Sequence, residues 1–327
     1  VAEFPEVSKQ NGLQRSVDFD IIIGNPPYGD ILRESEKGLV AFYRMGDINE
    51  VSAQFVERQL EILSGDGYFG NVTTLRLIHQ SSIGELHDIL RQTLDLTQIA
   101  CFGLRGRTGV FDNVLIRVSV ITGQKGTDGG GEIHTSDLLV FNDENRQQRF
   151  NNIEYNPSKG LVLTDRIGGK DATRAILPKV GPDVKLNLLK KLRRKTRETF
   201  SDRFSKDPSD VGGDQHAVWR VRGAGYWITP MLEELYSAQD VDPMYFETEL
   251  ERKTVFLIMN SSVFFVYWMT YGNQYLLNWI HVNGFPYPDE EVIEENSEEI
   301  IAMADAFWER MQDVFVKRKS RCHPCVR

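Results

Sequence analysis

The sequence predicts an α/β fold in which an open, mostly parallel sheet covered by helices is followed by a second, α+β domain. Up to about residue 125, short apolar runs alternate with stretches of helical periodicity, which is the order that parallel strands and crossover helices produce. Farther along, the chain becomes aromatic and partly basic and loses that alternation. With 327 residues, the chain has room for about two domains.

The expected strands of the first domain are four short apolar runs, at residues 19–23, 68–73, 99–102 and 115–122. The stretch VSAQFVERQLEIL lies between the first two and has the spacing of a helix, which the glycines of SGDG are expected to end. Its expected apolar face is Val51, Phe55, Leu60 and Leu63.

A second helix is expected before the third strand, with Ser81 or Ser82 as its N-cap. Its apolar stripe would be Ile83, Leu86, Leu90 and Leu94. The glycine-rich stretch GQKGTDGGGEI is not followed by a helix start or a Lys-Ser/Thr pair, so it predicts a loop rather than a phosphate-binding site.

The expected domain boundaries follow from these changes in pattern. Residues 1–140 form the first domain, and the polar, weakly periodic residues 141–185 form a linker or irregular segment. A second domain covers residues 186–290 and opens with the basic helix KLNLLKKLRRKTRETF. Residues 291–327 form a C-terminal helix and tail.

Composition limits the class of protein. The net charge of −9 and the pI near 5.3 argue against a generally basic nucleic-acid coat, so a polyanionic partner would need a local basic patch. Three cysteines are too few and too badly spaced for a disulfide framework, and the first residues lack a secretory pattern. These features favour a reducing, cytoplasmic setting.

The apolar segment at residues 254–272, TVFLIMNSSVFFVYWMTYG, is almost long enough to span a bilayer. Asn260, Ser261 and Ser262 lie together in its middle, and no Lys/Arg asymmetry brackets it. A buried core segment is therefore favoured over a membrane span, and no membrane partner is expected.

The stretch DFDIIIGNPPYGDI at residues 18–31 carries the clearest chemistry. Ligands of open α/β sheets bind at the carboxyl ends of strands, and Asn25 to Tyr28 directly follow an expected strand. Asn25 offers a side-chain acceptor, the rigid Pro26-Pro27 pair leaves the Pro26 carbonyl as a second acceptor, and Tyr28 offers a flat ring. Together they suit a planar group bearing an NH₂. The plainer alternative is a proline-closed turn with Tyr28 in the core.

This stretch resembles motif IV of S-adenosylmethionine-dependent amino-methyltransferases. It is similar above all to DNA adenine-N6 methyltransferases of the gamma class, including type IIG restriction-modification enzymes. The segments AEFPEV, FVERQLEILSGDGYFGNVTT and IGELHDILRQTLDL also resemble that family, and GVFDNVLIRVSVITG is similar to its motif VIII. The region from YWIT to GFPYP looks like a target-recognition domain. The resemblance implies a partial Rossmann-like methyltransferase sheet, containing the later strands only, before an α+β target-recognition domain.

The resemblance implies methyl transfer from S-adenosylmethionine to a flipped adenine of double-stranded DNA. Asn25 and Pro26, with Pro27 and Tyr28 in the same motif, would hold the amine by accepting its two N–H groups, which favours attack by the nitrogen lone pair. Tyr28 and Phe111 would stack on the two faces of the base. Phe111 has the ordinary alternative of a core residue beside a strand.

DNA contact would come from local charge, because the chain is acidic overall. The expected DNA-binding residues are Lys190, Lys191, Arg193, Arg194, Arg220, Arg222 and Asn273. Lys195 and Arg197 continue the same basic run. A run of charge is as often a solvated helix face.

The chain departs from the family in one respect. The glycine-containing cofactor motif of gamma-class enzymes precedes N-P-P-Y, but only 24 residues precede Asn25, and VRGAGYW is no substitute. The cofactor-binding residues are therefore unknown, and the isolated chain is expected to bind the cofactor weakly or not at all. The expectation is a fragment of a longer polypeptide or a split subunit completed by an upstream polypeptide, with a decayed remnant as the third possibility.

Two rival functions stay open. One is an N-P-P-Y methyltransferase acting on protein glutamine or RNA, although such proteins usually end soon after the sheet. The other is a non-catalytic DNA-recognition subunit. No nuclease pattern of spaced carboxylates with a lysine is evident, and Cys322, His323 and Cys325 supply one ligand too few for structural zinc, so no metal is expected.

Overall fold

The computed structural model describes residues 18–319, with several gaps. The gaps are residues 105–108, 112–115, 127–129, 141–144, 167–172, 195–197, 212–215, 223–230 and 234–240, and side chains are also left undescribed at 165, 166, 173 and 314–319. The chain divides into two compact units, Val1–Leu188 and Leu189–Arg327, and each is described by itself.

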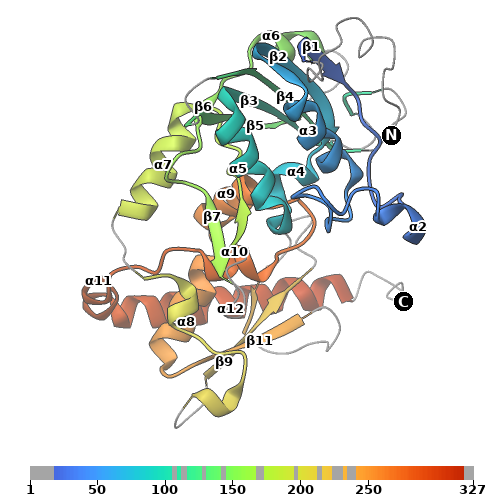
Figure 1. The fold of residues 1–327 in the computed structure, drawn as a ribbon. Helices are drawn as coiled ribbons and strands as arrows, with labels where there is room; N and C mark the ends of the chain where they lie inside the picture. Colours follow the sequence, from blue (N-terminus) through green and yellow to red (C-terminus); the bar gives the residue numbers. More distant parts are fainter. Residues whose placement is uncertain are drawn as a thin grey trace, which may run out of the picture. The chain divides into compact units, whose positions relative to one another are not determined.

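The first unit is built on a mixed six-stranded sheet (Figure 1). In spatial order its strands are β1 Phe19–Gly24, β2 Leu63–Thr74, β4 Val118–Lys125, β3 Leu94–Phe102, β5 Glu132–Leu139 and β6 Asn156–Pro157. The four predicted strands are thus present. The expectation of a mostly parallel sheet is wrong, because only the β1–β2 and β3–β5 pairs are parallel. β4 returns against β3 with no crossover helix among the described residues between them, so it pairs antiparallel on both sides.

Two helices cover one face of this sheet, α3 Val51–Glu61 and α5 Gly84–Thr93 (Figure 1). They bury a continuous apolar core that includes Val56, Leu60 and Leu86. Phe55 was expected on the buried face of α3, but its side chain is 45% exposed. The SGDG sequence was expected to end the helix, but it lies within β2 instead. The short helical elements α2 Glu34–Lys37, α4 Arg76–His79 and η1 Ser81–Ile83 complete this region.

On the opposite face of the sheet, apolar side chains of β1 and its neighbouring strands are exposed, and no described helix covers them. Ile21, Tyr68 and Leu96 lie in one cross-strand row through Gln124, and their side chains are 63%, 55% and 40% exposed. Ile23, on the same face, is 82% exposed. Among the described strands, β1 pairs only with β2, so its outer edge carries no partner strand there.

Residues 141–185, expected as a linker or irregular segment, carry regular structure in their described part. They contain α6 Arg146–Asn151, β6, β7 Leu163–Arg166, β8 Thr173–Ile176 and the start of α7 Asp183–Arg194. The segment packs closely on the first unit: the Leu177 amide donates to the Ile78 carbonyl at 3.1 Å, and Thr135 Oγ1 donates to the Pro178 carbonyl at 2.6 Å. A Cβ at Gly84 would lie 2.7 Å from that of Ala175, so the start of α5 lies directly against β8.

The second unit combines an antiparallel sheet with helices. The sheet has the order β10 Met231–Leu232, β9 His216–Val221 and β11 Val241–Phe246. The helical elements are η2 Phe200–Asp202, η3 Pro208–Asp210, α8 Glu249–Met259, α9 Ser262–Tyr271, α10 Trp279–Asn283, α11 Glu290–Glu295 and α12 Ser297–Lys319.

The long apolar segment at residues 254–272 forms α8 and α9, separated by a bend of 65°. Ser261 begins α9 by accepting the Phe264 amide at 3.2 Å on its hydroxyl, so the polar residues in the middle of the segment act as a break and a cap. Phe256, Phe264 and Trp268 are buried, as the prediction of a core segment requires. No single described helix is long and apolar enough to cross a membrane; the two helices pass that test only when taken together.

Candidate active site

The Asn25–Tyr28 loop leaves the sheet at the carboxyl end of β1, as the sequence predicts. The residue before the loop is Gly24, and no larger residue fits there. A Cβ at this position would overlap Asn71 Oδ1 and lie 2.8 Å from Gln59 Nε2. Asn71 and Gln59 are themselves joined by a hydrogen bond from the Asn71 amide to Gln59 Oε1. The glycine therefore lets β1 pass closely over a side-chain pair that links β2 to α3.

Asn25 and Tyr28 contact each other within the loop. The Tyr28 hydroxyl donates to Asn25 Oδ1 and lies 3.3 Å from the Val72 carbonyl oxygen. Asn25 and Pro27 are exposed, Pro26 is buried and Tyr28 is half-buried. Burial, reinforced by the negative charge of Glu50, raises the pKa of Tyr28 above its ordinary value, so the phenol keeps the proton that it donates.

A buried carboxylate fixes the end of the loop. Glu50 is fully buried and accepts the Gly29 amide at 2.8 Å and the Ser52 hydroxyl at 2.7 Å on the same oxygen. Its other oxygen lies 3.2 Å from Arg76 Nη1. The Val51 amide, at the start of α3, donates to the Gly29 carbonyl at 3.1 Å, and Gly29 has a φ of +87°, which glycine adopts without strain.

Sequence reasoning missed Glu50. The available signal was an acidic residue directly before an apolar-periodic stretch, which is a common position for a helix-capping residue. Nothing in that pattern shows that the carboxylate would reach back more than twenty residues to the N-P-P-Y loop.

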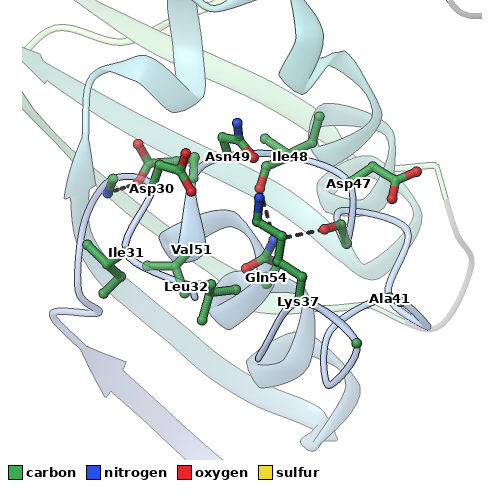
Figure 2. Close-up of a pocket in the computed structure, with 14 residues that line it drawn as sticks. Asp30, Ile31, Leu32, Lys37, Ala41, Asp47, Ile48, Asn49, Val51 and Gln54 are labelled. Carbon is green, nitrogen blue, oxygen red and sulfur yellow. Dashed lines mark hydrogen bonds between the residues drawn. The ribbon is translucent and has the colours of Figure 1, made fainter. Parts of the chain in front are cut away.

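A cavity of about 310 Å³ opens where the chain continues from this loop (Figure 2). Residues 29–32 form one side, and residues 46–51 with Gln54 form the other. The Gln54 amide nitrogen donates to the Met45 and Ile48 carbonyls, both at 3.0 Å, and the bond to Ile48 is among the dashed lines of Figure 2. These bonds fix the turn against α3. Helix α3 therefore supports the wall of the cavity, and Glu50 at its start supports the N-P-P-Y loop.

The other proposed base-stacking residue, Phe111, is 40% exposed. Residues 112–115, which follow it in the expected motif, lie outside the described residues. Its neighbour Val110 packs on the small apolar cluster around Phe102 and Val118, and no contact between Phe111 and Tyr28 is found among the described residues. The stacking of a base between Tyr28 and Phe111 therefore stays a prediction.

The expected DNA-binding residues differ in their surroundings. Lys190, Lys191 and Arg194 are exposed on α7, whereas Arg193 is half-buried and hydrogen-bonds the Tyr271 hydroxyl. Burial raises the pKa of Tyr271 to about 12, so its phenol stays neutral beside that arginine.

Arg220 is only 3% exposed and has three partners: the Leu277 carbonyl, the Asp242 carboxylate and the ring of Trp279, 4.0 Å away. Burial lowers its pKa from the ordinary value, although Asp242 opposes that shift. These contacts are typical of a residue that stabilises the second unit, not of one that binds a phosphate. Arg222 is more open, with its side chain 52% exposed and ion-paired to Asp242.

Asn273 uses its side-chain oxygen within its own turn, where it accepts the Tyr275 and Leu276 amides at 2.9 and 2.8 Å. Several residues named from the sequence lie outside the described residues: AEFPEV at 2–7, Lys195, Arg197, Cys322, His323 and Cys325. Among the described residues, no group of His, Cys, Asp or Glu could hold a metal ion.

Comparison with known proteins supports part of this interpretation. Residues 2–106 match the Eco57I restriction-modification methylase family, over about a third of the chain. The matched part contains the whole N-P-P-Y loop, Glu50 and helices α3 and α5. No curated protein matches the sequence.

Solved structures show looser similarities. The type IIL restriction-modification enzyme MmeI in complex with DNA is 12% identical, with a TM-score of 0.43 over 88% of this chain and 49% of that one. A modification subunit of a putative type I restriction enzyme from Vibrio vulnificus is also 12% identical, with a TM-score of 0.35 over 49% and 37%. A putative class I S-adenosylmethionine-dependent methyltransferase from Listeria monocytogenes is 13% identical, with a TM-score of 0.29 over 38% and 36%. This chain spans less than half the length of each.

Proposed function

We propose that this chain is the target-base and DNA-reading part of a DNA adenine-N6 methyltransferase of a restriction-modification system, of the gamma class and type IIG kind. The observation that carries the proposal is the N-P-P-Y loop at the carboxyl end of β1, inside a region that matches restriction-modification methylases. The loop is held from both sides of its acceptors: the Tyr28 hydroxyl donates to Asn25 Oδ1, and the Gly29 amide donates to Glu50, so the loop is shaped before any ligand arrives.

Asn25 and Pro26 would accept the two N–H groups of adenine N6. No described residue donates a hydrogen bond to the Pro26 carbonyl, and Asn25 Oδ1 has a second lone pair beside the one that receives the Tyr28 proton. When two acceptors hold the amine, its nitrogen becomes pyramidal and its lone pair is less delocalised into the ring. Both hydrogen bonds strengthen as positive charge develops on the nitrogen. Tyr28, whose hydroxyl is fixed, would present its ring to the base.

S-adenosylmethionine supplies the activated methyl group in this class of reaction. The described residues of this chain include no glycine turn, between a strand and a helix, of the kind that grips such a cofactor. We therefore propose that another polypeptide segment holds the cofactor.

The surface beside β1 supports that assignment. Isoleucine side chains that are 63% and 82% exposed, on a strand next to the proposed site, are costly to leave in water, by about 1 to 2 kcal/mol each. Parallel strands of α/β sheets are normally covered on both faces. A strand added at the free edge of β1, with a helix over Ile21 and Ile23, would complete the layer and place further residues at the carboxyl edge beside Asn25.

The test is methyl transfer by the full chain combined with a polypeptide that carries the expected cofactor motif. Transfer from labelled S-adenosylmethionine to bacterial genomic DNA, with N6-methyladenine identified by chromatography, is the expected result. The Asn25→Ala variant should lower the rate by about 100-fold or more, since an oriented hydrogen-bond partner of the reacting group is lost.

Asp66→Ala, at an exposed residue near the start of β2 that does not line the site, serves as the control for Asn25→Ala and should retain most of the activity. An unchanged rate in Asn25→Ala would contradict the proposed mechanism. A chain that binds DNA but never transfers a methyl group with any cofactor-binding partner would favour a non-catalytic recognition subunit. Methylation of protein glutamine or RNA in place of DNA would favour the other rival function.

A further inference from the structure

Helix α4 places an arginine beside the candidate active site. Strand β2 ends at Thr74, and Arg76 is the first residue of α4. The N-P-P-Y loop lies on the last part of the same strand, because the Tyr28 hydroxyl is 3.3 Å from the Val72 carbonyl oxygen. Since β1 runs parallel to β2, the loop and Arg76 both lie at the carboxyl edge of the sheet.

A buried carboxylate connects this arginine to the N-P-P-Y loop. Arg76 Nη1 lies 3.2 Å from one oxygen of Glu50, and the other oxygen accepts the Gly29 amide at 2.8 Å. The Glu50 side chain has no exposure to solvent, whereas the Arg76 side chain is 43% exposed. A single carboxylate therefore separates the partly exposed guanidinium from the end of the loop.

The backbone beside Arg76 contacts the second segment that is expected to hold the base. The Leu75 amide donates to the Arg117 carbonyl at 3.0 Å. Arg117 belongs to the GVFDNVLIRVSVITG stretch, which also contains Phe111, the second expected stacking residue. Arg76 thus follows a residue that contacts this stretch and is itself paired with the carboxylate that holds the loop.

Two side chains hold the guanidinium of Arg76 and leave part of it available. Arg76 Nε donates to Gln80 Oε1 at 2.9 Å, and Gln80 donates to Ser82 Oγ at 2.8 Å. Arginine has five N–H donors in one plane. Among the described residues, only Glu50 and Gln80 form an ion pair or a hydrogen bond with the Arg76 side chain. A guanidinium that is already oriented and still partly exposed can bind an anion with little further loss of side-chain entropy.

We propose that Arg76 binds the phosphate next to the target adenine and thereby places the flipped nucleotide in the N-P-P-Y loop. A base that leaves the duplex takes its sugar and phosphate with it, so a cation at the same sheet edge can hold the phosphate while the loop holds the amine. The planar donors of arginine match two oxygens of one phosphate. Glu50, which orients the guanidinium, acts as a positioning residue. The inference rests on the proposed function for its nucleotide substrate, but it concerns the binding of that substrate and not the transfer of the methyl group.

The alternative is an arginine whose only role is to neutralise the buried Glu50. In that case Arg76 would contribute to stability, and its replacement would not change how the chain distinguishes a nucleotide from a nucleoside. Ligands that differ only in the phosphate therefore separate the two roles.

The test compares the binding of deoxyadenosine and its 5′- and 3′-monophosphates to the full chain, by saturation-transfer NMR at one low salt concentration. At least one monophosphate should bind about fivefold to tenfold more tightly than the nucleoside, as expected for one partly exposed charge-assisted contact. Arg76→Gln should remove this advantage and leave the affinity for the nucleoside unchanged. Arg76→Lys should keep part of the advantage, because the charge remains but the planar pair of donors is lost.

A double variant guards against damage to the loop. Arg76→Gln alone leaves a buried carboxylate without its cation, whereas Glu50→Gln combined with Arg76→Gln removes both charges together. The double variant should also bind the nucleoside normally and lack the phosphate advantage. Arg58→Gln is the matched control, at a half-exposed arginine of α3 that pairs with Glu61, and should keep the full advantage.

The possible outcomes separate this inference from the proposed function. An advantage that persists in Arg76→Gln and in the double variant would overturn the role of Arg76. Nucleoside binding with no phosphate advantage in the unaltered chain would remove that role and leave the proposed base site standing. No binding of any of the three compounds would overturn both. An advantage that needs Arg76, in a chain that never supports methyl transfer, would leave the phosphate contact standing and remove the proposed function alone.

Discussion

At the scale of single residues, the shape of the N-P-P-Y loop depends on Glu50. One of its oxygens receives the backbone amide that follows Tyr28, and the other faces Arg76. A carboxylate with no exposure to solvent is stable only when its acceptors are used, so the loop and the start of α3 hold each other in place.

Replacing Glu50 tests this dependence. Glu50→Ala should lower the free energy of unfolding by about 2 kcal/mol, because the Gly29 amide and the Ser52 hydroxyl lose their acceptor. The Arg76 side chain is 43% exposed, so water can replace its ion pair with Glu50 in this variant, which limits the loss of stability. Glu50→Gln should cost less, since an amide oxygen still accepts both bonds. Urea denaturation measures the differences.

Glu61→Ala is the matched control, at an acid of the same helix whose ion pair with Arg58 is half-exposed on both sides. Exposed pairs of this kind contribute about 0.5 kcal/mol or less. Equal losses in Glu50→Ala and Glu61→Ala would show that Glu50 does not support the loop.

At the scale of elements, the sequence predicted the position of the strands better than their direction. Apolar runs mark β1 to β4 because strands that pack against a helical layer carry apolar side chains whichever way they run. Whether β4 lies parallel or antiparallel depends on pairing with β2 and β3, which are distant in sequence. Phe55 was assigned to the wrong face for a related reason: helical spacing defines a stripe but not which neighbouring stripe the sheet covers.

For the candidate site as well, local features could be predicted from the sequence and long-range contacts could not. Asn25 to Tyr28 were found because their chemistry is local and directly follows a strand. Phe111 could not be tested in the same way, because its approach to a base depends on a segment that is only partly described. Arg220 was assigned to DNA from its charge alone, whereas its burial depends on Asp242, Leu277 and Trp279, and no local pattern reveals those contacts.

Helix α5 contains a buried histidine that should make the first unit sensitive to acid. His87 is 1% exposed, and its Nε2 lies 2.7 Å from the Leu77 carbonyl, which can only accept, so the neutral ring donates from Nε2. Burial lowers the pKa of His87 from 6.5 to about 4. The unfolded chain therefore takes up the proton first, and stability is lost as the pH falls below about 6.5, toward 4.

The expected loss from this residue is about 2 kcal/mol at a pH near 4.5, by the linkage between pKa and stability. His87→Gln removes the titrating group and keeps a donor for the Leu77 carbonyl. Its free energy of unfolding, measured in urea at neutral and acid pH, should fall less steeply with acid than that of the unaltered chain. If the free energies of unfolding of the two proteins fell equally with pH, another group would be responsible for the loss of stability in acid.

At the scale of the whole molecule, the acidic charge means that the proposed DNA binding would have to use a local surface. The net charge is −9, yet Lys190, Lys191 and Arg194 lie exposed on one short stretch of α7. If Lys190 and Lys191 contact phosphates, replacing both with alanine should make the plot of log affinity against log salt less steep by about 2, as two fewer counterions are released.

Lys159→Ala provides a comparison, at an exposed lysine of the first unit. It should leave the slope unchanged. A slope equally reduced by Lys159→Ala, or unaffected by the double replacement, would remove α7 from the DNA-contacting surface. Binding measured over a range of salt concentrations by anisotropy gives the slopes.

The bare edge and face of β1 have a consequence for how such a chain survives after synthesis. A free strand edge beside exposed isoleucines is a template on which another copy can pair, and such pairing propagates into aggregates. Any form in which this surface stays open would be short-lived in a crowded cell. If the proposed additional segment covers β1, it would also protect this chain from aggregation, and the amount of functional protein would depend on how soon that segment reaches β1.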